Sequence, residues 1–115
     1  MDITRLTVHE LQEKLKNKEL TITEITKAYT DRINEKEKDV QAFVTILTKE
    51  ANEQAKQIEE KIDKGEIKGE FAGIPIGIKD NMCTKGIKTT CSSKMLKQHV
   101  HLKCLKILFL LMMQL

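Results

Sequence analysis

The sequence predicts an α/β fold in which helices come first and a sheet begins after them. Two capping boxes and three stripes of aliphatic residues at helical spacing predict helices within residues 1–65. Glycines and the single proline are then concentrated between residues 69 and 86, where isoleucines alternate with small or turn-forming residues. This change is typical of a passage from helices to a buried strand, so we expect the sheet to begin within residues 69–96.

The composition favours a small protein with an aliphatic core. Its 115 residues are 40% apolar and only 3% aromatic, so packing between helices must come from leucine, isoleucine, valine and alanine. The net charge is +3, and both signs alternate along the expected helices, which is typical of a solvated surface. No basic patch is interleaved with aromatic residues, so the charge pattern gives no argument for nucleic-acid binding.

Three helices are expected, and the first two have clear start signals. Thr7 with Glu10, and Thr21 with Glu24, form the spacing of a capping box. The third helix is expected from about residue 49 to residue 63, and Gly65 ends it. The apolar stripes are, in chain order, Leu6, Val8, Leu11 and Leu15; Ile22, Ile25, Tyr29 and Ile33; and Ala51, Ala55, Ile58 and Ile62. Between Val40 and Leu47, periodicity does not decide between an extended and a helical segment.

Lys79 is the candidate catalytic residue. It directly follows the run from Gly73 to Ile78, which has the composition of a buried strand. A lysine at that place is expected to be desolvated, and desolvation disfavours the ammonium form and leaves an amine that can act as a base. Asp80 would act in the opposite direction unless it faces solvent. The alternative is a solvated lysine at the end of a strand.

A resemblance to a known family supports the catalytic interpretation. Phe71–Asn81, followed by Thr84–Gly86 and Thr89–Leu96, resembles the amidase-signature family, and within it the branch formed by the A subunits of the tRNA-dependent glutamine amidotransferases. The resemblance extends from the first helices to Leu96. It implies a mixed sheet covered by helices, of which this chain would hold only the leading helices and the first strand or two. Residues 1–96 would then be the amino-terminal part of an amidase domain.

The resemblance also implies a chemical role. Lys79 matches the base of the family's Ser–cis-Ser–Lys triad, which hydrolyses glutamine and supplies ammonia for converting Glu-tRNA(Gln) to Gln-tRNA(Gln). Both family serines belong to a Gly/Ser-rich motif that has no match here, and Ser92 and Ser93 are the only serines of the sequence. A base without a nucleophile cannot perform covalent catalysis, so we expect the isolated chain to be inactive.

The implied partners are the B and C subunits of the amidotransferase complex, with tRNA bound through the complex. ATP and magnesium would be used by one of these partners, and no cofactor or metal site is expected in this chain. Cys83, Cys91 and Cys104 are odd in number and lack a zinc-binding spacing, which favours reduced thiols. His99 and His101 beside Cys104 would make a poor metal site. With no signal peptide and no membrane segment expected, the sequence predicts a cytoplasmic protein.

The segment 97–115 is interpreted as an aberrant tail. Its apolar run, Ile107–Met113, is too short for a membrane span of roughly 20 residues. Codons allowed for the tail, read from the third base of Lys97, can encode Thr-Thr-Cys-Ser-Ser-Lys-Met-Leu-Glu-Asn-Phe-Val-Pro-Pro-Tyr-Asp-Ala-Thr. The first eight residues repeat Thr89–Leu96, and the others continue the family pattern. We therefore predict a short tandem duplication that shifted the reading frame, which sequencing of the coding DNA would test.

Two alternatives remain open from the sequence. A small helical interaction protein with an apolar carboxy-terminal anchor would explain the capped helices and the tail, but not the glycine-rich segment of residues 69–93. Another amidase-family hydrolase would explain that segment, since substrate choice in the family normally depends on residues further along. The segment Thr89–Leu96 favours the tRNA-linked branch.

Overall fold

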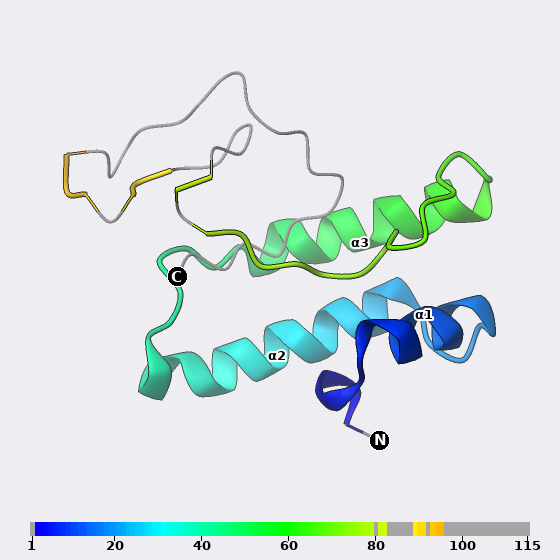
Figure 1. Cartoon of the computed structure of the whole chain (residues 1–115), viewed down its shortest axis with the longest axis horizontal. Helices are drawn as coiled ribbons and strands as arrows, with labels where there is room; N and C mark the ends of the chain where they lie inside the picture. The colour runs from blue at the N-terminus through cyan, green and yellow to red at the C-terminus, as the bar shows by residue number, and fades with distance from the viewer. Residues whose placement is uncertain (1, 80, 83–88, 92, 96–115) are drawn as a thin grey trace.

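The computed structural model describes residues 2–79, 81–82, 89–91 and 93–95. A short 3-10 helix, η1 (Ile3–Arg5), precedes three α-helices: α1 (Val8–Lys16), α2 (Ile22–Val40) and α3 (Thr48–Asp63). Helices α2 and α3 lie side by side and run in opposite directions, and α1 lies near the start of α2 (Figure 1). The three predicted helices are confirmed.

Both predicted capping boxes are present. The Thr7 hydroxyl accepts from the backbone N–H of Glu10 at 3.3 Å, and the Glu10 carboxylate accepts from the backbone N–H of Thr7 at 2.7 Å. Thr21 and Glu24 make the same pair of bonds at 3.1 and 2.8 Å. Each box satisfies backbone donors that a helix start leaves without an internal partner, so α1 and α2 begin where the sequence predicts.

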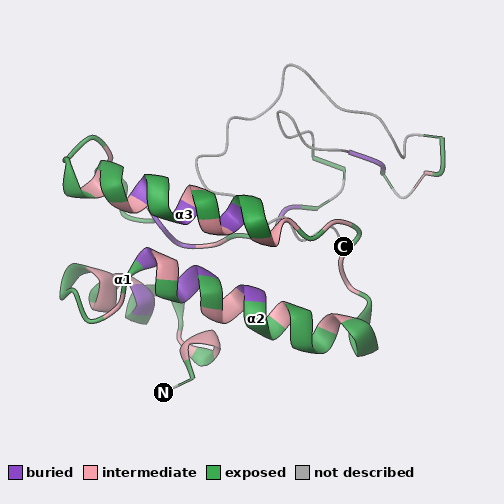
Figure 2. Ribbon diagram, turned by 180° about the vertical axis from the view of Figure 1, so that it is seen from behind, coloured by how far each residue is buried: buried purple, intermediate pink, exposed green. Residues whose placement is uncertain are grey.

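The core consists of two small aliphatic clusters, seen as buried positions where the helices face one another (Figure 2). Ile22, Ala55 and Ile58 form one between α2 and α3. Leu11, Ile25 and Ile74 form the other, between α1, α2 and the segment that follows α3. The expected stripes supply most of these residues. Val8 is an exception, because 42% of it is exposed.

The segment between α2 and α3, for which periodicity is undecided, is irregular. Helix α2 ends at Val40, and Gln41 adopts a left-handed conformation with φ at 49°. The Glu37 carboxylate then accepts from the backbone N–H of Phe43 at 2.7 Å. This bond turns the chain out of the helix, because it gives the first residues after the end a partner within the last turn.

The chain after α3 returns along the helices (Figure 1). The side-chain amide of Gln12 donates to the backbone carbonyl of Glu70 at 2.6 Å and ties this return to α1. Gly73 has φ at +87°, and a Cβ built there would lie 2.5 Å from Ile22 Cδ1. Glycine is therefore required at this position for both conformation and space. The close approach lets Ile74 enter the core.

The expected strand at Gly73–Ile78 is not present, and the described residues contain no strand. A strand would place Ile74, Ile76 and Ile78 on one face, whereas Ile74 and Ile78 are buried and Ile76 is 44% exposed. The physical reason is that a strand needs a hydrogen-bonded neighbour, and no described segment lies in that position. The rest of the predicted sheet region falls partly, and the tail 97–115 wholly, outside the described residues. The division at residue 96 stays a prediction.

Candidate active site around Lys79

Lys79 lies at the end of the returning segment. Ile78 before it is buried, with 5% exposed, and anchors the segment in the core. The Lys79 carbonyl accepts from the backbone N–H of Met82 at 2.9 Å, so a turn follows at once. The Lys79 side chain itself is exposed. The expectation of a desolvated lysine is therefore wrong for the described structure, because no described element covers it. Asp80 lies outside the described residues.

Two threonines that sequence reasoning did not single out lie beside this turn. Thr89 and Thr90 are buried, and the Thr89 hydroxyl donates to the carbonyl of Met82 at 3.4 Å. The Thr90 carbonyl accepts from the backbone N–H of Ser93 at 2.8 Å. The structure thus brings the Thr89–Cys91 part of the resemblance motif against the turn that follows Lys79. Their strand-like composition was the available signal, but it gave no partner.

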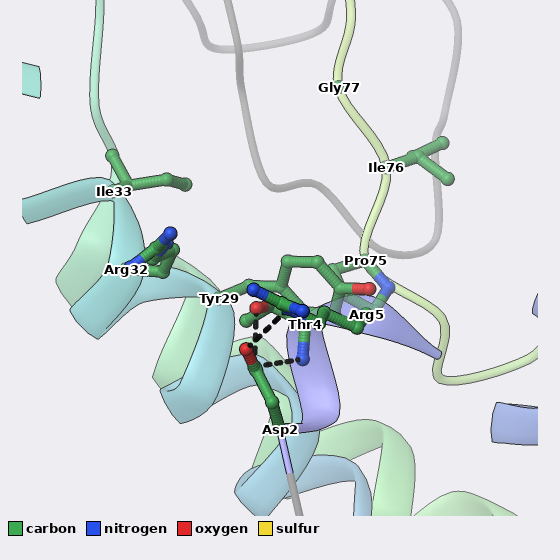
Figure 3. A pocket seen from close by; sticks show the side chains of 9 residues that line it. All are labelled: Asp2, Thr4, Arg5, Tyr29, Arg32, Ile33, Pro75, Ile76 and Gly77. Carbon is green, nitrogen blue, oxygen red and sulfur yellow. Dashed lines mark hydrogen bonds and ion pairs between the residues drawn. The ribbon is translucent and has the colours of Figure 1, made fainter. Parts of the chain in front are cut away.

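A cavity of about 400 Å³ opens between η1, α2 and Pro75–Gly77, close to Lys79 in the sequence (Figure 3). Apolar atoms of Tyr29, Ile33, Pro75 and Ile76 form much of its wall. Polar groups of η1 and Arg32 stand at its margin. A second cavity, of about 770 Å³, lies at the other end of the helices, where Gln12 and Glu70 line it.

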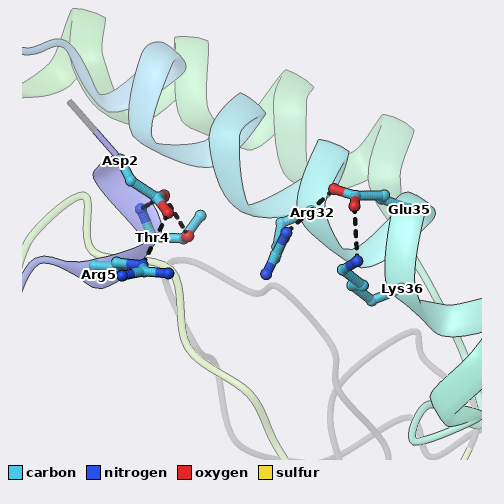
Figure 4. A network of polar contacts seen from close by, with 6 residues as sticks. All are labelled: Asp2, Thr4, Arg5, Arg32, Glu35 and Lys36. Carbon is cyan, nitrogen blue, oxygen red and sulfur yellow. Dashed lines mark hydrogen bonds and ion pairs between the residues drawn. The ribbon is translucent and has the colours of Figure 1, made fainter.

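The charged groups at the margin of the first cavity are paired. Asp2 accepts from the Thr4 hydroxyl at 2.6 Å and contacts Arg5 Nε at 3.2 Å (Figure 4). The Thr4 hydroxyl bond, helped by the Thr4 backbone N–H and the Arg5 charge, lowers the pKa of Asp2. Arg32 contacts Glu35 at 3.3 Å. Because both guanidinium groups already have carboxylate partners, the margin is not an open anion site.

Tyr29 responds to the same surroundings. Burial raises the pKa of its phenol, and the negative charge of Asp2 adds to the effect, since both disfavour the phenolate. Tyr29 therefore enters the cavity as a neutral group that presents ring carbons and one hydroxyl.

The other candidate residues are not brought together. Cys91 is exposed and unpaired, and Ser93 is half-buried. The remaining candidates, Ser92, Cys83, Cys104, His99 and His101, lie outside the described residues. Within the described ranges, no three histidine, cysteine or carboxylate side chains are arranged to hold a metal ion. In the same ranges, no helix has the length and apolar character that crossing a bilayer requires.

Residues 24–103 match the protein-family model described as Amidase. The chain belongs to the amidase family. The match covers well over half of the chain, and it includes Lys79, the turn after it and the buried threonines. Family membership favours the amidase interpretation over that of an unrelated helical interaction protein.

Amidase-family relatives are similar along most of the chain. The A subunit of the glutamyl-tRNA(Gln) amidotransferase of Desulforamulus reducens is 46% identical over 100 residues, which are 87% of this chain and 21% of that protein. The protein of the same name from Agathobacter rectalis is 49% identical over 96 residues, 84% of this chain and 19% of that protein. This amidase-family chain therefore spans about a fifth of the length of these curated relatives.

Solved structures of amidases share the fold. A bacterial aryl acylamidase of the amidase-signature family superposes with a TM-score of 0.78 at 23% identity, over 95% of this chain and 24% of that one. A protein from a vestigial complex, described in connection with the origins of an s-triazine catabolic enzyme, gives a TM-score of 0.80 at 17% identity. The predicted fold class is confirmed: the chain has the fold of part of an amidase-signature enzyme.

Proposed function

We propose that this chain is the amino-terminal part of the A subunit of a glutamyl-tRNA(Gln) amidotransferase, in which Lys79 is the base of the Ser–cis-Ser–Lys relay. The observation that supports the proposal most strongly is the identity of 46 to 49% with proteins of that name. Lys79 directly follows the motif of residues 71–78, where the resemblance places the family's lysine.

The relay transfers one proton and one acyl group. A neutral Lys79 amine accepts a proton from the bridging serine, which accepts one from the second serine as its oxygen attacks the amide carbon of glutamine. The carbon–nitrogen bond breaks, the proton returns to the leaving group, and ammonia departs. Water then hydrolyses the glutamyl ester, and glutamate is released. The chain contributes the base, and the remainder of the domain contributes both serines.

Lys79 is exposed in this structure, so the proposal requires the rest of an amidase domain to cover it. Covering would remove water from the side chain and disfavour the ammonium form. The lysine thus becomes a base only within the assembled domain, which agrees with the prediction that the isolated chain is inactive.

In the proposed setting the complex acts as an ATP-dependent carbon–nitrogen ligase in the cytoplasm. The B and C subunits are the partners, one of them uses ATP and magnesium, and tRNA is bound through the complex. The names of the relatives support this assignment, since they describe an amidotransferase that acts on glutamyl-tRNA(Gln).

The test is a hybrid A subunit, in which this chain's residues 1–96 replace the matching stretch of the Agathobacter rectalis protein, produced with that organism's B and C subunits. We expect glutamine hydrolysis, and a fall in kcat of roughly 10²–10⁴-fold on Lys79→Ala, because a positioned base contributes that factor. Lys79→Arg should be equally inactive, since guanidinium stays protonated.

The exposed Lys94→Ala is the matched control, and it should leave kcat unchanged. The unmodified chain of 115 residues, purified alone, should release no ammonia from glutamine. Retention of activity by the Lys79→Ala hybrid would remove Lys79 from the relay, and ammonia release by the isolated chain would refute the requirement for downstream serines.

A further inference from the structure

The backbone of Ile76–Ile78 is extended but unpaired. Among the described residues, none of its three N–H groups has a hydrogen-bond acceptor, although backbone bonds are made on both sides, from Ile74 to Phe71 and from Met82 to Lys79. Buried backbone groups in folded proteins are almost always paired, and Ile78 is buried. A row of unpaired donors on an extended segment is the edge that another strand can join.

The side chains hold this edge in place and leave its outer surface apolar. Ile74 packs with Leu11 and Ile25, and the buried Ile78 anchors the other end. Ile76 between them is 44% exposed and borders the cavity that Tyr29 and Ile33 also line (Figure 3). A strand added here would pair with the backbone and place an apolar side chain over Ile76, as in other cases of strand addition.

We propose that residues 75–79 are a docking edge to which a β-strand from the remainder of an amidase domain adds. The occupant follows from the lengths of the relatives. This chain accounts for about a fifth of its curated relatives and, at a TM-score of 0.80, for 25% of a solved amidase-fold chain. Three quarters of that fold therefore lies beyond the part that this chain represents, and the unpaired edge is where the described part is incomplete.

The inference rests on family membership and on the unpaired backbone, and it does not depend on the role of Lys79. Its readout is binding, so it can fail while the proposed chemistry holds, and the reverse. It also predicts a property that the relay does not require, namely that the two parts of the domain associate without a peptide bond between them.

The experiment co-expresses the full 115-residue chain, carrying an affinity tag, with the Agathobacter rectalis A subunit lacking the stretch that matches this chain. We expect a soluble one-to-one complex. We also expect hydrogen exchange of the Ile76–Ile78 amides to slow by roughly 10²-fold relative to the chain alone, since strand pairing protects amides that are otherwise open.

Two glutamate variants with similar exposure separate the edge from general stickiness. Ile76→Glu should abolish co-purification, because it places a charge on the docking edge. Val8→Glu, at a position on α1 that is 42% exposed, should bind normally. Far-UV circular dichroism of each variant alone should match the parent chain, which shows that the helices are intact.

Several outcomes would overturn the proposal. A remainder that stays insoluble or unbound on co-expression is one, and a complex in which the Ile76–Ile78 amides still exchange rapidly is another. Equal loss of binding in both glutamate variants would mean that the edge is not specific. Self-association of the chain alone, with protection of the same amides, would identify a second copy as the occupant.

Discussion

The helices and the returning segment of residues 69–79 contain the same kinds of aliphatic residue, but their backbones are satisfied differently. Helices α1 and α2 satisfy their own donors and are closed at their starts by Thr7 and Thr21. In the returning segment, Ile76–Ile78 has no such partner among the described residues. A helix can be complete within a short stretch of chain, whereas an extended segment depends on a neighbour that can be far away in sequence.

The difference also separates burial from structure. Ile74 and Ile78 are buried much like the helical core residues, and yet their segment is not a strand. The hydrophobic effect has no direction and can hold an isoleucine against the helices without specifying its backbone partner. Stability is therefore expected to depend mainly on the helical region.

The largest effect should come from truncating the helical core. Ile25 is fully buried, and Ile25→Ala should lower the free energy of unfolding by about 4 kcal/mol, because it removes buried methylene groups and leaves a cavity. Ile76→Ala, at an exposed isoleucine of the returning segment, should cost less than about 1 kcal/mol. Urea unfolding followed by circular dichroism measures both. Equal costs would contradict the comparison.

A somewhat smaller effect is expected where the two regions meet. Gly73→Ala should cost about 2–3 kcal/mol, because a side chain at φ +87° is strained and its Cβ would collide with Ile22. Gly65→Ala is the matched control, since φ is +72° there but nothing lies within 4 Å. It should cost only about 1 kcal/mol, from strain alone. If the two glycines behave alike, the contact with Ile22 has no energetic importance.

The capping boxes should contribute less again. Thr21→Ala should lower stability by about 1 kcal/mol, because the first backbone donors of α2 lose their acceptor. The measurement is the shift of the unfolding midpoint in urea. Thr21→Ser keeps the hydroxyl and should recover most of the loss, which a merely steric role for Thr21 would not predict.

The smallest effect is an acid-induced loss of helix stability. Hydrogen bonds from the Thr7 backbone and hydroxyl hold the pKa of Glu10 below its ordinary value of 4.5. The contribution to stability is thus fully present above about pH 4.5 and is lost as the pH falls through the lower folded-state pKa. Helix content followed by circular dichroism from about pH 7 to about pH 3 should decline in that window. Glu10→Gln should weaken the decline, and an unchanged profile would remove Glu10 from the explanation.

The same contrast explains how much the sequence could predict. The starts of α1 and α2 were predictable because Thr7–Glu10 and Thr21–Glu24 are local pairs that act within one turn of helix. The parity of Ile74, Ile76 and Ile78 predicted a shared face, and this was wrong because strand pairing is a long-range property. Burial of Thr89 beside Met82 was missed for a similar reason, since composition carries no information about which turn a hydroxyl will reach.

The bond between Gln12 and Glu70 spans 58 residues, and it has a consequence for the order of events during synthesis. All three helices have been translated before the carbonyl that Gln12 binds exists, and domains begin to fold from the amino terminus as they are made. Ile74 emerges later still. The nascent protein therefore passes through a stage in which Leu11 and Ile25 have met each other but not their third partner, and one side of that cluster still faces water until the ribosome has added a few more residues.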